Sequence, residues 1–275
     1  MAEQPHSDLM AGRRGIIMGV ANDHSIAWGI ARMLAAHGAE LAFTYQGEAQ
    51  GKRVRPLAAS VGSDLAVPCD VGSDHELDEA FGAIAAQWNR VDFLVHAIAY
   101  SDRNELKGRY VETSRANFIS TLNISCYSFT AVARRCTPLM GNGGAMLTLT
   151  FGGASRVMPN YNVMGLAKAA LEASVRYLAA DLGKDGVRVN AISAGPMRTL
   201  AGAGVGDARI LYKWNKAQSP LKKNIELEHV GGAALYLLSE LSSGVTGEIH
   251  YVDAGYNVIG MPQDLKGWIA PENGN

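Results

Sequence analysis

Short apolar segments alternate with longer segments of helical periodicity along almost the whole chain. The short segments cover residues 15–20, 40–45, 65–69, 92–97, 145–150, 187–192 and 248–253, and the helical patterns cover residues 25–38, 76–88, 117–140, 161–183 and 226–240. Strands that are apolar throughout and separated by helices are typical of a parallel sheet covered on both faces. We therefore predict an α/β fold: one Rossmann-like, doubly wound, seven-stranded parallel sheet flanked by helices, with right-handed crossovers.

The composition narrows the class of protein further. The chain has 275 residues, of which 48% are hydrophobic, so it can bury a large core, and its net charge of −1 gives no sign of a nucleic-acid partner. No apolar run approaches the length of a membrane-spanning helix, and the first residues lack the apolar core of a signal peptide. We expect a single domain over residues 13–261, with a disordered tail over residues 1–12 and another tail over residues 262–275.

Three scattered cysteines, Cys69, Cys126 and Cys136, are too few for a disulfide framework. Small buried thiols in a reducing compartment are the simpler interpretation, so we expect a cytoplasmic protein. No spacing of His, Cys, Asp or Glu suggests a metal site, and we predict none.

The first predicted strand ends in the segment GVANDHSIAWG, residues 19–29. It lacks the G-x-G-x-x-G pattern, but it combines a glycine at a strand end, Gly19, with a polar loop and a helix start. Ser25 or Asp23 can cap that helix, and backbone N–H groups near Ser25 and Ile26 can hold a pyrophosphate. An ordinary strand–helix turn is the alternative. The position in the first βα unit favours a dinucleotide cofactor.

The ends of the second and third strands predict how the adenosine half would bind. Gln46 follows the second strand where a 2′-phosphate would require an arginine, which favours NADH over NADPH. Asp70 follows the third strand and can accept a hydrogen bond from the adenine amino group, with Val71 as a wall. The alternative role for Asp70 is a helix cap, but the segment GSD after it can cap the helix itself.

The fourth strand ends in HAIAYS, residues 96–101. The small Ala97 and Ala99 leave room for a cofactor, and Ile98 can pack against it. His96 lies inside the strand, so we interpret it as a core histidine with hydrogen-bond partners.

Tyr161 and Lys168 are seven residues apart at the start of a predicted helix, so they share a face with about 10 Å of rise between them. A phenol can donate a hydrogen bond to a developing oxyanion, and a lysine two turns later can bind ribose hydroxyls. Gly165 stands four residues after Tyr161, so the Tyr-x-x-x-Lys pattern of most short-chain dehydrogenases is absent here. Tyr212 and Lys216 do have that spacing, but they follow the sixth strand and are predicted to form an exposed helix turn.

Several segments together resemble one family closely. They are PNYNVMGLAKAALEASVRYLA, VRVNAISAGPMRTLA, LAFTYQ, GVANDHSIAWG and SSGVTGEIHYVDAGY. The chain is similar, from about residue 15 to residue 261, to the bacterial NADH-dependent enoyl-acyl-carrier-protein reductases of the short-chain dehydrogenase superfamily, and most similar to alphaproteobacterial members.

The resemblance implies the last reduction in fatty-acid elongation, with hydride moving from NADH to the β-carbon of a trans-2-enoyl thioester. It implies that Tyr161 holds the enolate oxygen, that Lys168 binds the nicotinamide ribose, and that Ser101 contacts the substrate. It also implies a lid over about residues 202–217, a homotetramer and an acyl-carrier protein as partner. The implied cofactor contacts are Gly19, Ser25, Ile26, Gln46, Asp70, Val71, Ile98, Lys168, Met197, Arg198, Thr199, Leu200 and Ala201.

Phe151 departs from the family pattern, which usually has a second tyrosine at this place. Phe151 either walls the acyl channel, leaving Tyr161 as the donor, or marks a specialised copy with altered activity. Two other functions stay open: a reductase of 3-oxoacyl or other carbonyl groups, and a low-activity protein that binds NAD(H) as a sensor. Basic residues near the expected portal, namely Arg103, Lys107, Lys213 and Lys216, could steer an acidic carrier protein or could be solvated surface charges.

Overall fold

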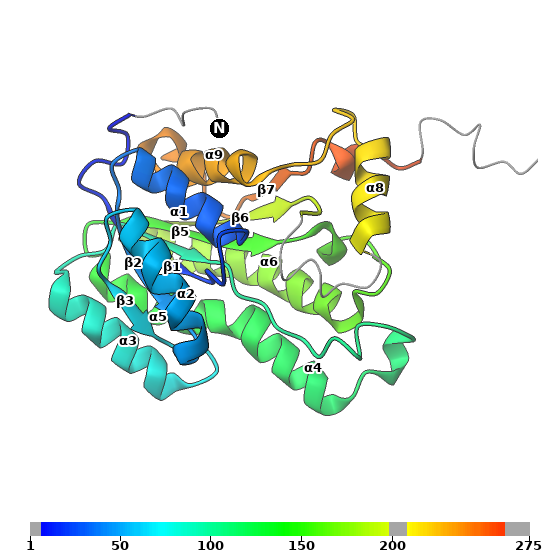
Figure 1. The fold of residues 1–275 in the computed structure, drawn as a ribbon, viewed down its shortest axis with the longest axis horizontal. Helices are drawn as coiled ribbons and strands as arrows, with labels where there is room; N and C mark the ends of the chain where they lie inside the picture. The colour runs from blue at the N-terminus through cyan, green and yellow to red at the C-terminus, as the bar shows by residue number, and fades with distance from the viewer. Residues whose placement is uncertain (1–6, 198–207, 262–275) are drawn as a thin grey trace, which may run out of the picture.

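The computed structural model describes residues 7–197 and 208–261 (Figure 1). A seven-stranded parallel sheet has the order β3-β2-β1-β4-β5-β6-β7, which confirms the predicted fold class. The strands are β1 (Arg14–Met18), β2 (Glu40–Tyr45), β3 (Ala66–Pro68), β4 (Phe93–His96), β5 (Gly144–Thr150), β6 (Val187–Ala194) and β7 (Ile249–Val252). The helices are α1 (Ile26–Ala36), α2 (Gly47–Ser60), α3 (Asp74–Gln87), α4 (Arg115–Leu122), α5 (Ser128–Cys136), α6 (Asn162–Leu182), α8 (Ala208–Gln218) and α9 (Leu227–Leu238).

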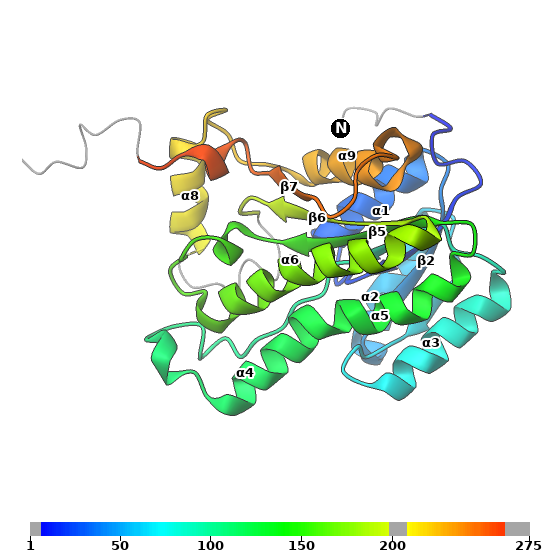
Figure 2. The ribbon, with the colours of Figure 1, turned by 180° about the vertical axis from the view of Figure 1, so that it is seen from behind.

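Two hydrophobic clusters pack on opposite faces of the sheet. Ile17 of β1 and Phe43 of β2 belong to the cluster that is covered by α1, α2 and α9, whereas Ile16 of β1 belongs to the cluster under α3, α5 and α6. Figures 1 and 2 show α1 and α9 above the strands and α3, α5 and α6 below them. The period-two alternation of a strand therefore divides one mostly apolar segment between two cores, which explains why these strands do not alternate between apolar and polar residues.

The strand order reverses between β1 and β4. β1 pairs with β2 on one side and with β4 on the other, so that Met18 is the register partner of both Thr44 and His96. The loops that follow β1 and β4 thus diverge from neighbouring strand ends. Crevices at such a reversal are the usual ligand sites of doubly wound sheets.

Two helices differ from the sequence prediction. The segment predicted as one helix over residues 117–140 contains α4, a π-helical turn at Asn123–Tyr127, and α5. α2 was not predicted, because it is polar on most of its surface and contains Pro56. The π-helical turn matters for the site, because π-bulges rotate side chains out of the regular helical stripe.

The N-terminal tail predicted over residues 1–12 is too long. Met10 is 1% exposed, and its backbone N–H donates to the carbonyl of His37 at 2.8 Å. A hydrogen bond of 3.1 Å joins Ser7 Oγ and His37 Nδ1. Residues 7–12 therefore belong to the folded domain, because one buried methionine anchors a polar segment; residues 1–6 and 262–275 lie outside the described residues.

Among the described residues, no helix is both long enough and apolar enough to cross a bilayer. Within residues 7–197 and 208–261, no group of three or more His, Cys, Asp or Glu side chains could hold a metal ion. The three cysteines are free, and Cys69 and Cys136 are buried as predicted, whereas Cys126 is partly exposed.

Candidate active site

The turn after β1 brings the backbone close to the neighbouring strand end. Gly19 has a φ of +103°, and a Cβ atom there would lie 2.1 Å from the carbonyl oxygen of Ala97 after β4. Only glycine fits this conformation and this contact. The small residues that the sequence placed at these strand ends are thus needed for the chain to turn at the reversal point.

Ser25 stands at the N-cap position of α1, but its side chain does not cap the helix as we predicted. Its Oγ accepts hydrogen bonds from the backbone N–H groups of Ala21 and Asn22, at 3.0 and 3.1 Å, which closes the preceding loop instead. No side-chain cap hydrogen bond, from Asp23 or Ser25, covers the start of α1. A helix N-terminus left open in this way, beginning at Ile26, suits an anionic group.

Gln46 and Asp70 meet across the ends of β2 and β3. Gln46 Nε2 donates to Asp70 Oδ2 at 2.8 Å, and Asp70 Oδ1 accepts from the backbone N–H of Gly72. Ser73, not Asp70, caps α3 by accepting from the Glu76 N–H. The helix-cap interpretation of Asp70 is therefore wrong, and the two predicted cofactor residues form one polar group at the sheet edge.

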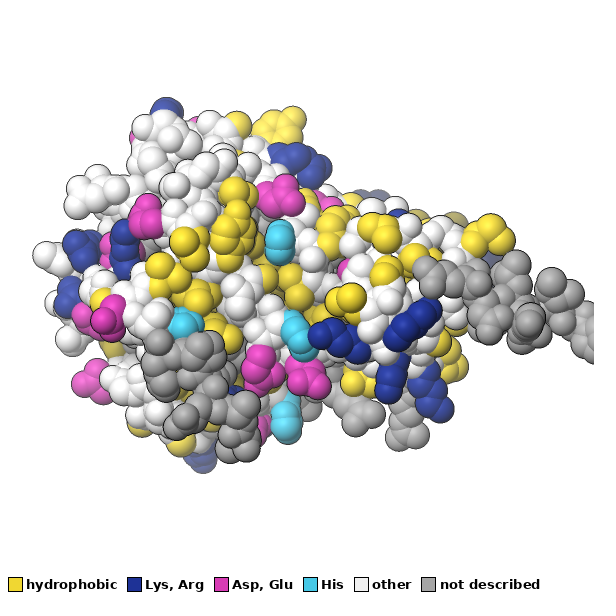
Figure 3. All heavy atoms as spheres, turned by 90° about the horizontal axis from the view of Figure 1, so that it is seen from above, with side chains coloured by type: hydrophobic (Ala, Val, Ile, Leu, Met, Phe, Trp, Pro, Cys, Tyr) yellow, Lys and Arg dark blue, Asp and Glu magenta, His cyan; other side chains and the backbone are white. Residues whose placement is uncertain are grey.

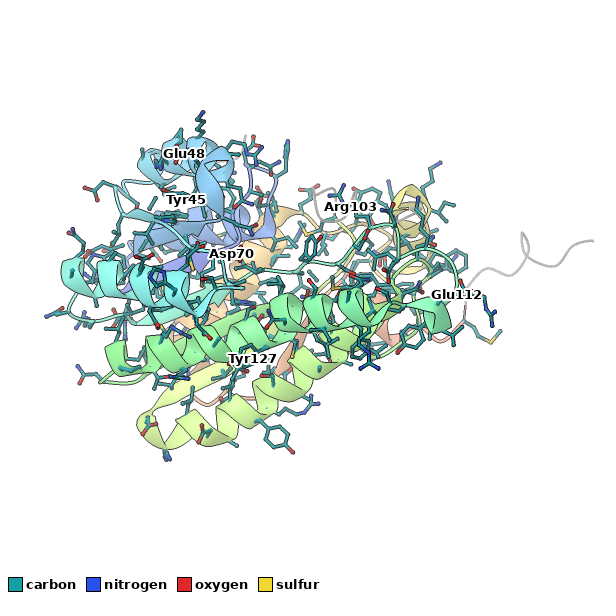
Figure 4. The ribbon with its side chains drawn as sticks, turned by 90° about the horizontal axis from the view of Figure 1, so that it is seen from below. Tyr45, Glu48, Asp70, Arg103, Glu112 and Tyr127 are labelled. Carbon is teal, nitrogen blue, oxygen red and sulfur yellow. The ribbon has the colours of Figure 1, made fainter. Side chains whose placement is uncertain are left out.

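A neighbouring arginine is already bound by protein groups. Arg55 donates to both carboxylate oxygens of Glu48, at 2.8 and 2.9 Å, and to the hydroxyl of Tyr45 at 2.6 Å. The hydrogen bond with Glu48, followed by the one with Tyr45, raises the pKa of Arg55, and Arg55 lowers the pKa of Glu48. Tyr45, Glu48 and Asp70 lie on the β2–β3 side of the molecule, away from Arg103 and Glu112 (Figure 4).

The loop after β4 is tied down by α4. Ser101 is buried; its Oγ accepts from Thr121 Oγ1 at 2.9 Å and donates to Asn117 Oδ1 at 3.3 Å. Val71 and Ile98 are partly buried and pack on the same apolar cluster under α3 and α5. Ser101 is thus held as part of a hydrogen-bonded unit, which sequence spacing did not indicate.

Tyr161 and Phe151 lie side by side. Their ring centroids are 5.2 Å apart with an interplanar angle of 65°, an edge-to-face contact. Tyr161 is the N-cap residue of α6 and is 7% exposed. Burial, followed by the charge of Glu172, raises the pKa of the Tyr161 phenol, so the group stays protonated and can donate at neutral pH.

Lys168 lies on the same helix with its ammonium group inside the protein. It is 6% exposed, and its Nζ donates to the carbonyl oxygen of Leu149 in β5 at 2.7 Å. Burial lowers the pKa of Lys168 to about 8, while Cys126 and Glu172 act to raise it. The predicted catalytic residues are therefore both buried, at the start of α6 and beside the end of β5.

His96 is a core histidine, as predicted. It is fully buried, and its ring nitrogens contact Thr148 Oγ1 at 3.2 Å and Ser128 Oγ at 2.8 Å. Burial, followed by the charge of Lys168, lowers the pKa of His96 to about 3. This imidazole is therefore neutral at physiological pH.

A pocket opens between the Phe151 ring and α8. Trp214 of α8 donates from Nε1 to the hydroxyl of Tyr256 at 3.0 Å, so that α8 is joined to the segment after β7. Met197 is partly buried and packs on the hydrophobic cluster that α1, α2 and α9 cover. The other predicted cofactor residues of this segment, Arg198, Thr199, Leu200 and Ala201, lie outside the described residues. The pocket is lined by Phe151, Gly152, Met158, Ser193, Ala194, Gly195, Pro196, Leu211, Trp214, Asn215, Asp253 and Tyr256.

Part of the predicted lid is regular structure. Residues 208–218 form α8, which contains both Tyr212 and Lys216; Lys216 is exposed and Tyr212 is partly buried. The prediction of an exposed helix turn is therefore correct for Lys216 but too simple for Tyr212.

Two further groups of the site were not predicted. Gly153 lies under the Tyr161 ring, where a Cβ atom would come within 2.5 Å of Cδ1. Thr150 Oγ1 donates to Glu172 Oε1 at 2.8 Å, one helical turn after Lys168. A pair of glycines and a glutamate on a helix face are common in sequences. Only their contacts in the folded protein show that these residues belong to the site.

Comparison with known proteins places the chain in a family. A family model described as "Enoyl-(Acyl carrier protein) reductase" matches residues 19–257. A Rhizobium meliloti protein named enoyl-[acyl-carrier-protein] reductase [NADH] 2 is 66% identical over 254 residues, which cover 92% of this chain and 95% of that protein. Two crystal structures each have a TM-score of 0.92. FabI of Candidatus Liberibacter asiaticus is 57% identical, covering 93% of this chain and 99% of that one. The Anaplasma phagocytophilum reductase in complex with NAD is 56% identical, covering 95% and 100%. The chain therefore belongs to the enoyl-(acyl carrier protein) reductase family, as its motifs predicted.

Proposed function

We propose that this protein reduces the trans-2 double bond of enoyl thioesters carried by acyl-carrier protein, using NADH, in fatty-acid elongation. The names of its close relatives support the reaction and the cofactor. The observation in this chain that carries the proposal is the buried Tyr161, whose protonated phenol stands beside an apolar ring and a pocket between β5, β6 and α8. A donor in such a place can stabilise an oxygen that becomes negative.

The donor set fits a dinucleotide. The open start of α1 suits the pyrophosphate, the Gln46–Asp70 pair suits the adenosine end, and the ammonium of Lys168 suits ribose hydroxyls. When bound, NADH supplies the hydride that the β-carbon accepts. The proposed cofactor residues are Gly19, Ser25, Ile26, Gln46, Asp70, Val71, Ile98, Lys168 and Met197 to Ala201.

In the proposed mechanism Tyr161 donates its hydroxyl hydrogen bond to the thioester carbonyl. Negative charge moves to that oxygen as the β-carbon is reduced, so the hydrogen bond strengthens in the transition state. The α-carbon then takes a proton from solvent. Ser101 and Phe151 are proposed to contact the substrate, with Phe151 as an apolar wall that leaves Tyr161 as the phenolic donor.

The preference for NADH has a physical basis near β2. Arg55 is engaged by both oxygens of Glu48, so its charge is compensated where a 2′-phosphate would need positive charge. The residue that follows the strand is the neutral Gln46. Glu48→Gln, which removes the charge that compensates Arg55, should therefore lower the ratio of NADH to NADPH use, with Glu79→Gln on α3 as a charge-matched control.

The carrier protein is proposed to approach near α8. Exposed lysines gather there, at Lys213 and Lys216 of α8 and at Lys222 and Lys223 after it. Figure 3 shows dark blue side chains at this part of the molecule. Arg103 and Lys107 are also exposed. Raised salt should increase the apparent KM for an acyl-carrier-protein substrate but not for a small thioester if these charges steer the encounter.

We also propose a cytoplasmic homotetramer. Exposed apolar side chains on the outer faces of α4 and α6, such as Ile119 and Tyr177, support an assembly through these helices. Light scattering of the purified protein measures its mass directly, and a monomer at micromolar concentration would contradict the tetramer.

The function is tested by NADH oxidation with a trans-2-enoyl thioester, in parallel with NADPH and with a 3-oxoacyl thioester. Fast turnover with the enoyl substrate and NADH supports the reductase and shows that Phe151 is tolerated. Turnover of the 3-oxoacyl substrate instead would support the carbonyl reductase. Tight NADH binding without turnover of either would support the specialised copy or sensor.

A further inference from the structure

Three charged residues follow one another along a single face of α6. Lys168, Glu172 and Arg176 are spaced by four residues each, so they lie one above the next. Lys168 is buried, Glu172 is half-buried and Arg176 is exposed. A line of alternating charge therefore runs from the active-site end of the helix to its surface.

The end of β5 holds the first two of these charges. The carbonyl of Leu149 accepts from Lys168 Nζ at 2.7 Å, and the hydroxyl of the next residue, Thr150, donates to Glu172 Oε1 at 2.8 Å. Thr150 is itself buried. Successive strand residues thus fix successive turns of the helix, with the carboxylate of Glu172 one turn from the ammonium group.

A buried ammonium ion is costly unless an opposite charge or strong hydrogen bonds compensate for lost hydration. One carbonyl provides part of this compensation for Lys168. We propose that Glu172 is a positioning residue, which keeps Lys168 charged and oriented on the Leu149 carbonyl so that it can hold the cofactor ribose. The inference rests on the proposed function, because it gives a role to the predicted cofactor lysine.

The other titratable groups around Lys168 do not replace Glu172. Cys126, from the π-helical turn, supports the charge only as a thiolate, and burial raises the pKa of its thiol. His96 of β4 has a pKa of about 3 and is therefore neutral at the pH of the assay, and the phenol of Tyr161 is protonated. Burial also raises the pKa of Glu172, but the Thr150 hydrogen bond, Arg176 and Lys168 favour its ionised form.

The alternative is that Glu172 only ties α6 to β5. The two roles differ in their pH dependence. Loss of a purely structural contact would lower activity similarly at every pH. Loss of the charge lowers the pKa of Lys168, so that activity and cofactor affinity fail at a lower pH than in the wild type.

The test compares wild type with Glu172→Gln, which keeps the shape and an acceptor for Thr150. kcat/KM with NADH and an enoyl thioester is measured from pH 6 to pH 10, and the Kd for NADH is measured over the same range by nicotinamide fluorescence. From a Lys168 pKa of about 8, a decrease of about one unit would lower activity about ninefold at pH 9 and less than about twofold at pH 6.5. The Kd of the wild type should begin to rise above about pH 8, and the Kd of the variant should begin to rise at a pH about one unit lower.

Three further variants separate the possible outcomes. Glu228→Gln, on α9, is the charge-matched control and should leave both pH profiles unchanged. Cys126→Ser should also keep the decrease of kcat/KM at alkaline pH. If that decrease disappears, the thiol is the titrating group and the inference is wrong. Thr150→Val should give a smaller shift in the same direction and should add nothing to Glu172→Gln in the double variant. If Glu172→Gln does not fold, Thr150→Val carries the test alone.

The inference fails if Glu172→Gln folds, binds NADH and shows an alkaline limb at the wild-type position. It fails equally if activity is lost by the same factor at all pH values. If wild type turns over none of the substrates, the proposed function is wrong, but the NADH-binding profile still decides whether Glu172 controls the charge of Lys168.

Discussion

Removing the Tyr161 hydroxyl tests the central step of the proposed mechanism. The ring is held by its edge-to-face contact with Phe151 and by Gly153, and both contacts remain in Tyr161→Phe. The substitution therefore removes one hydrogen-bond donor with little change of packing. Loss of one donor to an oxyanion lowers kcat by roughly 10² to 10³, which corresponds to about 2.7–4 kcal/mol.

The assay is turnover of an enoyl thioester at saturating NADH, together with the Kd for NADH and the free energy of unfolding. We expect kcat of Tyr161→Phe to fall by at least about 10²-fold. The Kd should change less than about threefold, and the unfolding free energy should change by less than about 1.5 kcal/mol, because only a hydroxyl is lost.

Phe151→Tyr is the matched variant, because it adds a hydroxyl to the neighbouring ring. If Tyr161 is the donor, Phe151→Tyr changes kcat by less than about tenfold, which is below the loss of one oxyanion donor. The double variant Phe151→Tyr/Tyr161→Phe should stay close to Tyr161→Phe alone. Equal and small effects of the two single substitutions would refute the assignment of Tyr161, and full recovery in the double variant would show that either position can supply the donor.

Three other predictions concern the frame of the site. Gly19→Ala should weaken NADH binding and lower stability, measured by fluorescence titration and urea unfolding, because its Cβ would lie 2.1 Å from the Ala97 carbonyl oxygen. Gly153→Ala should lower kcat more than NADH affinity, because its Cβ would come within 2.5 Å of the Tyr161 ring. Folding lowers the pKa of His96 to about 3, whereas an unfolded histidine has a pKa near 6.5. Keeping His96 neutral therefore costs no stability above about pH 6.5. As the pH is lowered, the unfolded state binds the proton first, and the free energy of unfolding falls by about 2 kcal/mol at pH 5. The free energy of unfolding, measured with urea at pH 8 and pH 5, should fall less at pH 5 in His96→Gln than in the wild type. An equal decrease in both proteins would contradict the buried neutral imidazole.

The sheet could be predicted from the sequence because each strand is a short apolar segment between turn residues. β2 occupies Glu40–Tyr45, as predicted, and the other strands differ by one or two residues at their ends. The π-helical turn at Asn123–Tyr127 could not be predicted, since one extra residue in a turn leaves composition and approximate periodicity unchanged. α2 has a polar surface and an internal Pro56, so its apolar pattern was too weak to recognise.

Within the site, positions were more predictable than contacts. Gln46 and Asp70 were each placed at a strand end by the order of elements, but their hydrogen bond depends on side-chain rotamers and on β2–β3 register. The Ser25 hydroxyl turns back into its own loop, because two N–H groups there compete with the helix for the same oxygen. The sequence does not single out Glu172, because a glutamate between two basic residues on a helix usually indicates a solvated face.

The spacing of Tyr161 and Lys168 has a structural reason that involves two glycines. Gly165 stands at the position where a Tyr-x-x-x-Lys motif would have its lysine, and a Cβ atom there would lie 2.9 Å from the carbonyl oxygen of Gly153. The turn that carries Gly153 therefore packs directly on this face of α6, and Gly153 is also close to the Tyr161 ring. A lysine at position 165 would displace that turn and the Tyr161 ring with it. Lys168, on the next turn of the helix, reaches the carbonyl of Leu149 without entering this contact, so the longer motif is compatible with the close approach of Gly153 and Gly165.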